Sequence, residues 1–268
     1  MGAMQKLAGL MRRAIEKYDM IQPGDRIAVG VSGGKDSVAL LVGLAKLKEY
    51  IGIDYEIVAI TLDPCFNGVE TDYSPIAKLC EELGIPYVLK RTEIGQIVFD
   101  VRNESNPCSL CARMRRGCLH DAAKENGCNK IALGHHYDDV IETILMGMLY
   151  GAQIQTMMPK LHSTNFEGME LIRPLYLIRE DDIKAWRDYN DLRFIQCACK
   201  FTDTCTTCNN EENQSKRVEI KQLIAEIKKK NPYVEAHIFK SVENVNIETV
   251  IAYKKDGVKH HFLDNYDL

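Results

Sequence analysis

Residues 26–37 read Arg-Ile-Ala-Val-Gly-Val-Ser-Gly-Gly-Lys-Asp-Ser, and this stretch decides the fold. The apolar run 27–31 predicts a buried parallel strand, and residues 38–47 repeat apolar side chains with the period of a helix. Residues 32–34, Ser-Gly-Gly, form the turn between the two. A glycine turn before a helix leaves backbone N–H groups pointing outward at the positive end of the helix dipole. The stretch therefore predicts a binding site for an anion such as a phosphate.

Side chains around this turn add donors for phosphate oxygens. Lys35 contributes a positive charge, and Ser32 and Ser37 contribute hydroxyl groups. Each charge-assisted hydrogen bond contributes about 1.5–3 kcal/mol, so four or five suffice to hold a pyrophosphate group. The motif is not a Walker P-loop, which needs four residues between its first glycine and the Gly-Lys pair. The predicted phosphate-binding residues are Ser32, Gly33, Gly34, Lys35, Asp36 and Ser37.

Length and composition suit one large α/β domain with a small appendage. The chain has 268 residues, of which 46% are hydrophobic, and contains no apolar run of about 18 residues that predicts a membrane span. No secretory signal is visible, so a cytoplasmic protein is expected. The net charge is −4, so any contact with nucleic acid must come from a local basic patch. Ten cysteines, with two Cys-x-x-Cys pairs, indicate metal or redox chemistry in a reducing compartment rather than disulfides.

Strands and helices alternate over most of the chain, which predicts a mainly parallel sheet with helices on both faces. The further predicted strands are 55–62, 87–91, 130–134, 169–175 and a short one at 194–196. The predicted helices are 4–20, 74–83 with Ser74 as its cap, 109–126, 138–150, 180–189 and 215–230. Loops are predicted at 93–107 and 151–168, and a β-hairpin at 247–262. We expect three parts: an N-terminal helix at 1–20, a catalytic domain at 21–213 and an appendage at 214–268.

The first Cys-x-x-Cys pair, Cys108 and Cys111, is expected at the start of a helix. Two thiolates at this spacing can hold one metal ion or one cluster, although a pair of core or redox thiols is the alternative. Arg113, Arg115 and Arg116 follow, and their charge lowers thiol pKa values and offers contacts to phosphate. A solvated basic helix face is the alternative interpretation of these arginines.

A second group of cysteines has Cys-x-Cys and Cys-x-x-Cys spacing and consists of Cys197, Cys199, Cys205 and Cys208. These four could form a separate zinc site. Alternatively, one of them joins Cys108 and Cys111 in holding a [4Fe–4S] cluster. Three protein ligands would leave one iron open, and an open iron can hold an exogenous sulfide.

Residues 134–139, Gly-His-His-Tyr-Asp-Asp, follow the strand predicted at 130–134. They are therefore expected at the carboxyl edge of the sheet, where ligands of α/β proteins bind. His135 is expected to line the nucleotide pocket, with metal ligation as the alternative. Asp138 is a candidate general acid or base, and Asp139 is expected to orient it or to cap the following helix.

Taken together, these motifs resemble the tRNA 2-thiocytidine synthetase family of the PP-loop ATP pyrophosphatase superfamily. The matching segments are Ser-Gly-Gly-Lys-Asp-Ser at 32–37, Pro-Cys-Ser-Leu-Cys-Ala-Arg-Met-Arg-Arg-Gly at 107–117, Ala-Leu-Gly-His-His-Tyr-Asp-Asp at 132–139, Ile-Arg-Pro-Leu at 172–175 and the basic helix from Lys216. The resemblance covers residues 5–245. It implies a Rossmann-like sheet of the adenine-nucleotide α-hydrolase type.

The resemblance also implies an ATP-dependent tRNA thiolase that uses Mg²⁺ and a [4Fe–4S] cluster. The C2 oxygen of a pyrimidine in a tRNA loop, with cytidine favoured, is adenylated, and sulfide on the open iron then replaces it. A sulfur donor, either a cysteine desulfurase or free sulfide, and a homodimer are implied as well.

Roles for individual residues follow from the same resemblance. Ile60, Leu62, Gly134 and His135 join residues 32–37 in binding ATP. The implied catalytic residues are Asp138 for proton transfer, Arg115 for charge near the cluster and Lys35. The implied tRNA contacts are Arg113, Arg116, Lys216 and Arg217.

The third cluster ligand is where the chain departs from the family pattern, which has a single Cys-x-x-Cys there. Counting back from the basic helix favours Cys208, whereas counting forward from the preceding strand favours Cys197 or Cys199. Two other functions stay open. One is a PP-loop enzyme that adenylates a small molecule, for amidation or sulfur chemistry, without tRNA. The other is a zinc-stabilised nucleotide-binding module without catalysis.

Overall fold

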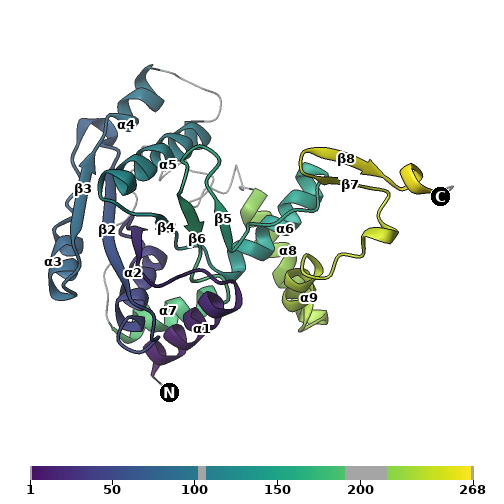
Figure 1. The fold of residues 1–268 in the computed structure, drawn as a ribbon, viewed down its shortest axis with the longest axis horizontal. Coiled ribbons are helices and arrows are strands. Elements are labelled where there is room, and N and C mark those ends of the chain that lie inside the picture. Colours follow the sequence, from purple (N-terminus) through teal and green to yellow (C-terminus); the bar gives the residue numbers. More distant parts are fainter. Residues whose placement is uncertain (1, 102–106, 191–215, 267–268) are drawn as a thin grey trace.

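The computed structural model describes residues 2–101, 107–190 and 216–266, and these form an α/β domain followed by a small hairpin (Figure 1). The six-stranded sheet has the order β3-β2-β1-β4-β6-β5, and only β5 is antiparallel to its neighbour. The strands are β1 (Asp25–Gly30), β2 (Tyr55–Asp63), β3 (Tyr87–Arg91), β4 (Lys130–Ala132), β5 (Lys160–His162) and β6 (Glu170–Ile172). The predicted mainly parallel, Rossmann-like sheet is confirmed.

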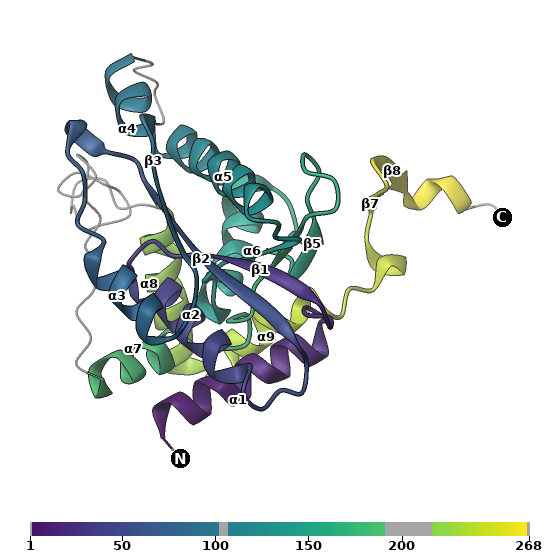
Figure 2. The same cartoon turned by 60° about the vertical axis from the view of Figure 1, so that its left-hand side comes forward.

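Helices cover both faces of this sheet, as predicted (Figure 2). On one face α1, α2 and α7 pack against one another, whereas α5 contacts β1, β2 and β4 from the other face. A third group, α6, α8 and α9, packs together beside the sheet. The longer helices are α1 (Ala3–Lys17), α2 (Lys35–Leu47), α3 (Ser74–Glu82), α5 (Pro107–Glu125), α6 (Tyr137–Gly151), α7 (Glu180–Tyr189), α8 (Lys216–Lys230) and α9 (Val234–Ser241). Short helical turns are α4 (Ile94–Gln96), η1 (Phe66–Gly68), η2 (Ile97–Val101), η3 (Ile247–Thr249) and η4 (Phe262–Asn265).

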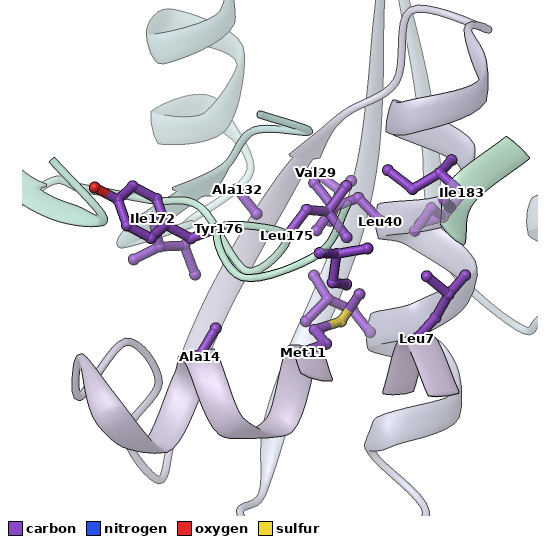
Figure 3. Packing of buried hydrophobic residues seen from close by; sticks show 14 of the residues in the cluster. Leu7, Met11, Ala14, Val29, Leu40, Ala132, Ile172, Leu175, Tyr176 and Ile183 are labelled. Carbon is purple, nitrogen blue, oxygen red and sulfur yellow. The ribbon is translucent and has the colours of Figure 1, made fainter. Parts of the chain in front are cut away.

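The hydrophobic core lies on both sides of β1 because successive side chains of a strand point to opposite faces. Ile27 and Val29 join the cluster that α1 and α2 cover, where Met11 and Leu40 are fully buried (Figure 3). Ala28 belongs instead to the cluster beneath α5. Burial on both faces explains why residues 27–31 form a continuous apolar run.

Three segments differ from the prediction. Residues 94–101, predicted as a loop, form α4 and η2, because Ile94 and Val98 are buried together with Phe66. Within the predicted loop 151–168, β5 pairs with β6, a contact between strands of three residues that local pattern does not reveal. Helix α9 was not predicted, and its Phe239 stacks on Tyr137 at 4.4 Å.

Helix and turn boundaries shift by small amounts. Helix α3 includes Ser74, so Tyr73, and not Ser74, precedes its first turn. The predicted hairpin is confirmed as β7 (Ala252–Lys255) and β8 (Val258–His261), joined at Asp256 and Gly257. Both turn residues have positive φ, as a two-residue hairpin turn of type I′ requires. The strand predicted at 194–196 and the domain boundary predicted at 213 lie outside the described residues.

Across the described ranges, the membrane-span criterion of length and apolarity is not met by any helix.

Candidate nucleotide-binding site

The turn after β1 closes on itself through its two serines. Gly33 has a φ of +84°, a conformation that favours glycine, and Gly34 immediately precedes the first residue of α2. The Ser32 backbone N–H donates to Ser37 Oγ at 3.2 Å, and Ser37 Oγ donates to the Gly34 carbonyl at 2.9 Å. This bonding holds the N-terminus of α2 in place and presents its first N–H groups as an anion site.

A cavity of about 440 Å³ opens at the carboxyl end of the parallel strands, beside this turn. Predicted residues that form its wall are Ser32, Asp36, Ser37, Ile60, Leu62, Arg115, Arg116, Gly134 and His135. The lining combines apolar residues of β2, Ile60 and Leu62, with the two α5 arginines. A pocket of this size and polarity suits a nucleotide.

Gly134 lets the loop after β4 approach the start of α2. A Cβ at this position would lie 3.0 Å from the carbonyl carbon of Asp36 and 3.1 Å from the backbone nitrogen of Ser37. Backbone atoms cannot move aside as a flexible side chain can. Glycine is therefore required here for the two loops to meet at the cavity.

His135 and Asp139 bring polar groups to the same wall. Burial and the positive charge of Arg173 lower the pKa of His135 to about 4, so its ring is neutral at pH 7. The Arg173 side chain donates to His135 Nδ1 at 3.4 Å, which leaves the ring proton on Nε2. Asp139 accepts from the His136 backbone N–H at 3.0 Å and thereby caps α6.

Two residues predicted to be catalytic, Asp138 and Lys35, are not among the residues that line this cavity. Asp138 contacts Arg179 at 2.9 Å and accepts from the Glu180 backbone N–H at 2.7 Å, which caps α7. Lys35 Nζ lies 3.0 Å from Asp36 and 3.1 Å from Glu180. Burial alone would raise the pKa of Glu180, but its hydrogen bond to Lys35 and nearby cations outweigh burial and lower the pKa to about 2.

The four residues expected to contact tRNA have different environments. Arg116 is exposed at the cavity rim and Arg113 is exposed on α5. Lys216 is exposed, with its Nζ 4.8 Å from the centre of the Tyr150 ring. Arg217 instead lies between two carboxylates of α6.

The structure describes only some of the cysteines that were predicted to bind a metal or a cluster. Cys111 on α5 is buried against Phe66, Ile94 and Val98. It directly precedes Ala112 and lies about one helical turn from Arg115, and both of these residues belong to the cavity wall. A buried thiol next to the nucleotide pocket fits a cluster ligand. The side chain of Cys108 and the residues Cys197, Cys199, Cys205 and Cys208 lie outside the described residues, and the side chains inside them contain no metal-binding group of three or more His, Cys, Asp or Glu.

Leu119 and His120 also line the cavity and were not singled out from the sequence. His120 Nδ1 lies 2.8 Å from the Arg116 carbonyl oxygen, and its ring stacks on Phe166 at 4.6 Å. The sequence contained a signal for both residues. Positions 119 and 120 follow Arg115 and Arg116 by four residues and so lie on the same helix face.

The PP-loop domain family matches residues 5–206. The chain belongs to the PP-loop family. It is 38% identical over 236 residues to the tRNA-cytidine(32) 2-sulfurtransferase of Geotalea uraniireducens. The aligned region covers 87% of this chain and 88% of that protein. It is 36% identical over 244 residues to the enzyme of the same name from Syntrophotalea carbinolica, covering 90% and 89%. The resemblance to the tRNA 2-thiocytidine synthetase family is thereby confirmed.

The fold of this PP-loop protein is also found in a solved structure. The U34-tRNA thiolase NcsA from Methanococcus maripaludis, described with its [4Fe–4S] cluster, superposes with a TM-score of 0.69. The two chains are 24% identical, and the match covers 92% of this chain and 83% of the other. At this identity the comparison establishes a shared fold.

Proposed function

We propose that this PP-loop protein is an ATP-dependent tRNA sulfurtransferase. It adenylates the C2 oxygen of a cytidine in a tRNA loop and then replaces that oxygen with sulfur. The observation that carries the proposal is one cavity wall that contains Ser32 and Ser37 of the phosphate-binding turn together with Ala112 and Arg115 of α5, next to buried Cys111. The names of relatives at 36–38% identity over most of the chain support the same reaction.

Different residues of the cavity wall bind different parts of ATP. The N–H groups at the start of α2 and the hydroxyls of Ser32 and Ser37 bind phosphate oxygens, and Ile60 and Leu62 pack against adenine. Asp36 Oδ1 is buried and has no hydrogen-bond partner among the described groups. A carboxylate oxygen in this state suits Mg²⁺, which prefers oxygen ligands, and we assign the ion to Asp36.

Charged side chains of the wall then act on the adenylation step. Arg115 and Arg116 stabilise negative charge that develops on the phosphate and on the leaving AMP. Of the two predicted carboxylates, Asp139 faces the cavity, so we move the proton-transfer role from Asp138 to Asp139. Asp138 holds the start of α7, where Glu180 meets Lys35. Lys35 reaches a phosphate once it leaves Glu180.

Cys108 and Cys111, with Cys208 as the third ligand and Cys197 or Cys199 as alternatives, would hold a [4Fe–4S] cluster. Such a cluster would supply an iron without a protein ligand, which could carry the sulfide. Arg113, Arg116 and Lys216 contact tRNA phosphates, and the target base is unpaired because its C2 edge is inaccessible in a helix. A cysteine desulfurase or free sulfide provides the sulfur, and the enzyme works as a homodimer in the cytoplasm, where its thiols stay reduced.

The first experiment is anaerobic purification followed by iron, sulfide and zinc analysis. About four irons and four sulfides per chain are expected for one such cluster. Cys111→Ala should lose iron and tRNA thiolation while remaining folded, and Cys128→Ala is the matched control. Cys128 is also buried, but it packs at the opposite end of the sheet and should retain iron. Zinc without iron, or full iron in Cys111→Ala, would reject the proposal.

A second candidate is adenylation of a small molecule, which the net charge of −4 favours. Conversion of ATP to AMP without RNA, and no sulfur incorporation into tRNA, would select it.

A further inference from the structure

Two adjacent cations at the start of α8 lie in opposite environments. Lys216 is exposed beside Tyr150. Arg217 is turned toward α6, where one guanidinium nitrogen lies 2.9 Å from Asp139 Oδ1 and 2.9 Å from Glu142 Oε2. The sequence alone treats the pair as one basic patch, but the structure separates their tasks.

Glu142 explains why a cation is needed at this place. Its side chain is only 3% exposed, and burial raises its pKa to about 7 although Lys221 and Arg217 act to lower it. Lys221 is the second cation that faces it, at 3.7 Å. Removing Arg217 would leave the buried carboxylate with one distant partner, which is strongly unfavourable.

Asp139 connects this pair to the nucleotide cavity. One of its oxygens accepts from the His136 backbone N–H, and the other meets Arg217. With both oxygens held, the carboxylate has one orientation in the cavity wall. Arg217 therefore determines how Asp139 is presented to a bound nucleotide.

Helix α8 is linked to Lys35 through Glu180 of α7. Lys221 lies 3.5 Å from Glu180 Oε2, and Glu180 Oε1 lies 3.1 Å from Lys35. Helix α8 packs beside α6 (Figures 1 and 2). Its side chains also contact Glu142 of α6 and Glu180 of α7. In the sequence α8 directly follows the segment with the four later cysteines.

We infer that Arg217 is a positioning residue for the nucleotide site, which orients Asp139 in the cavity wall and seats α8 on α6, and that it does not contact tRNA phosphate. The inference rests on the proposed function in one respect, namely that the cavity binds ATP.

The test compares Arg217→Gln with Lys216→Gln in the full chain. Each variant removes one positive charge, at neighbouring positions. Affinity for a non-hydrolysable ATP analogue is measured without tRNA, and tRNA affinity is measured across a salt series. Arg217→Gln should weaken nucleotide binding at least tenfold and leave the salt dependence of tRNA binding unchanged. Lys216→Gln should keep wild-type nucleotide affinity and lower the slope of log affinity against log salt by about one.

The opposite pattern would overturn the inference: wild-type nucleotide affinity in Arg217→Gln together with a reduced salt slope makes Arg217 a tRNA contact. Arg217→Lys should recover part of the nucleotide affinity, because an ammonium group keeps the charge but not the planar geometry. If wild type binds the analogue but fails to thiolate tRNA, the proposed function falls while the comparison of affinities still decides the role of Arg217.

The double variant Glu142→Gln/Arg217→Gln separates positioning from folding. It removes the buried charge together with its partner, so it should fold even where Arg217→Gln does not. Nucleotide binding should stay at least tenfold weaker than in wild type, because Asp139 still lacks its partner. Full recovery of affinity would show that Arg217 only neutralises Glu142, and the positioning role would be rejected.

Discussion

Ion pairs with a buried member lie at both ends of the central sheet, and the candidate nucleotide-binding site lies at the carboxyl end. At the amino end, Lys130 is 3% exposed and pairs with Asp25 and Glu170. At the carboxyl end, the ion pairs of Arg217 and Glu180 include Asp139, a residue of the cavity wall, and Lys35, a residue of the phosphate-binding loop. Burial of charge and a cavity are thus found at both ends, whereas the glycine turn at the start of α2 borders the cavity at the carboxyl end.

The comparison shows what a buried charge can and cannot indicate. At the amino end the charges satisfy one another, and Asn129 completes the set by donating to Asp25 at 2.7 Å. Such a network holds β4 and β6 in register with β1 and therefore contributes to the stability of the sheet. The network at the carboxyl end has members whose position a bound phosphate can change.

The largest expected effect is at the amino end. Lys130→Met leaves two carboxylates without their buried cation, and it should lower the free energy of unfolding by about 3–5 kcal/mol. The ATP affinity of the folded protein should not change. Urea denaturation and nucleotide titration measure the two quantities. Lys160→Met, which removes a more exposed partner of Glu170, is the control and should cost less than about 1 kcal/mol. A comparable loss of unfolding free energy in both variants would contradict a structural role that is specific to the buried ion pairs of Lys130.

Gly134→Ala should break the functional end alone. Its Cβ would press on the backbone of Asp36 and Ser37, and overpacking of this kind costs about 1–3 kcal/mol. Because the strain falls on the phosphate-binding loop, ATP affinity should fall by about tenfold or more. Isothermal titration with an ATP analogue measures the effect. Gly9→Ala, where nothing lies within 4 Å of the new Cβ, should bind as wild type does. Unchanged affinity in Gly134→Ala would show that the loop contact does not define the site.

Lys35→Ala should have a smaller effect that is again confined to binding. The lost charge–phosphate contact should weaken ATP binding by about tenfold, within the range of a single charge-assisted hydrogen bond. Iron content should stay at the wild-type level, because the Lys35 side chain contacts the carboxylates of Asp36 and Glu180 and is not a proposed cluster ligand. Lys46→Ala, on the exposed side of the same helix, is the control. Loss of iron in Lys35→Ala would mean that the two halves of the site are more tightly coupled than proposed.

The smallest expected effect is a change in pH dependence at His135. Its folded-state pKa of about 4 lies below the ordinary value of 6.5, so its contribution to stability is present above pH 6.5 and is lost as pH falls toward 4. His135→Gln should therefore flatten the stability profile between pH 6.5 and 4. Thermal unfolding of both proteins across this range measures it. Parallel profiles of stability against pH in the two proteins would show that His135 does not cause the loss of stability at low pH.

Much of the fold follows from short-range pattern. The apolar run 27–31, the glycine turn and the helix behind it were predictable, because each depends on residues within one element or one turn. Strand β5 and helix α9 were not, because their three-residue pairing and their Phe239 stack depend on segments that fold elsewhere. In the same way, α4 forms where Ile94 and Val98 find a buried cluster.

The sequence by itself determined which chemical groups are available: a glycine turn before a helix, a Cys-x-x-Cys pair beside arginines and a His-Asp segment after a strand. Only the tertiary structure decided which charges meet. It paired Lys35 with Glu180, and Arg217 with Asp139 and Glu142, across 75 or more positions of the chain. Motif spacing describes neighbours within a few residues. Ion pairs between α6, α7 and α8 depend instead on how those helices pack, and that packing gives two adjacent cations different roles.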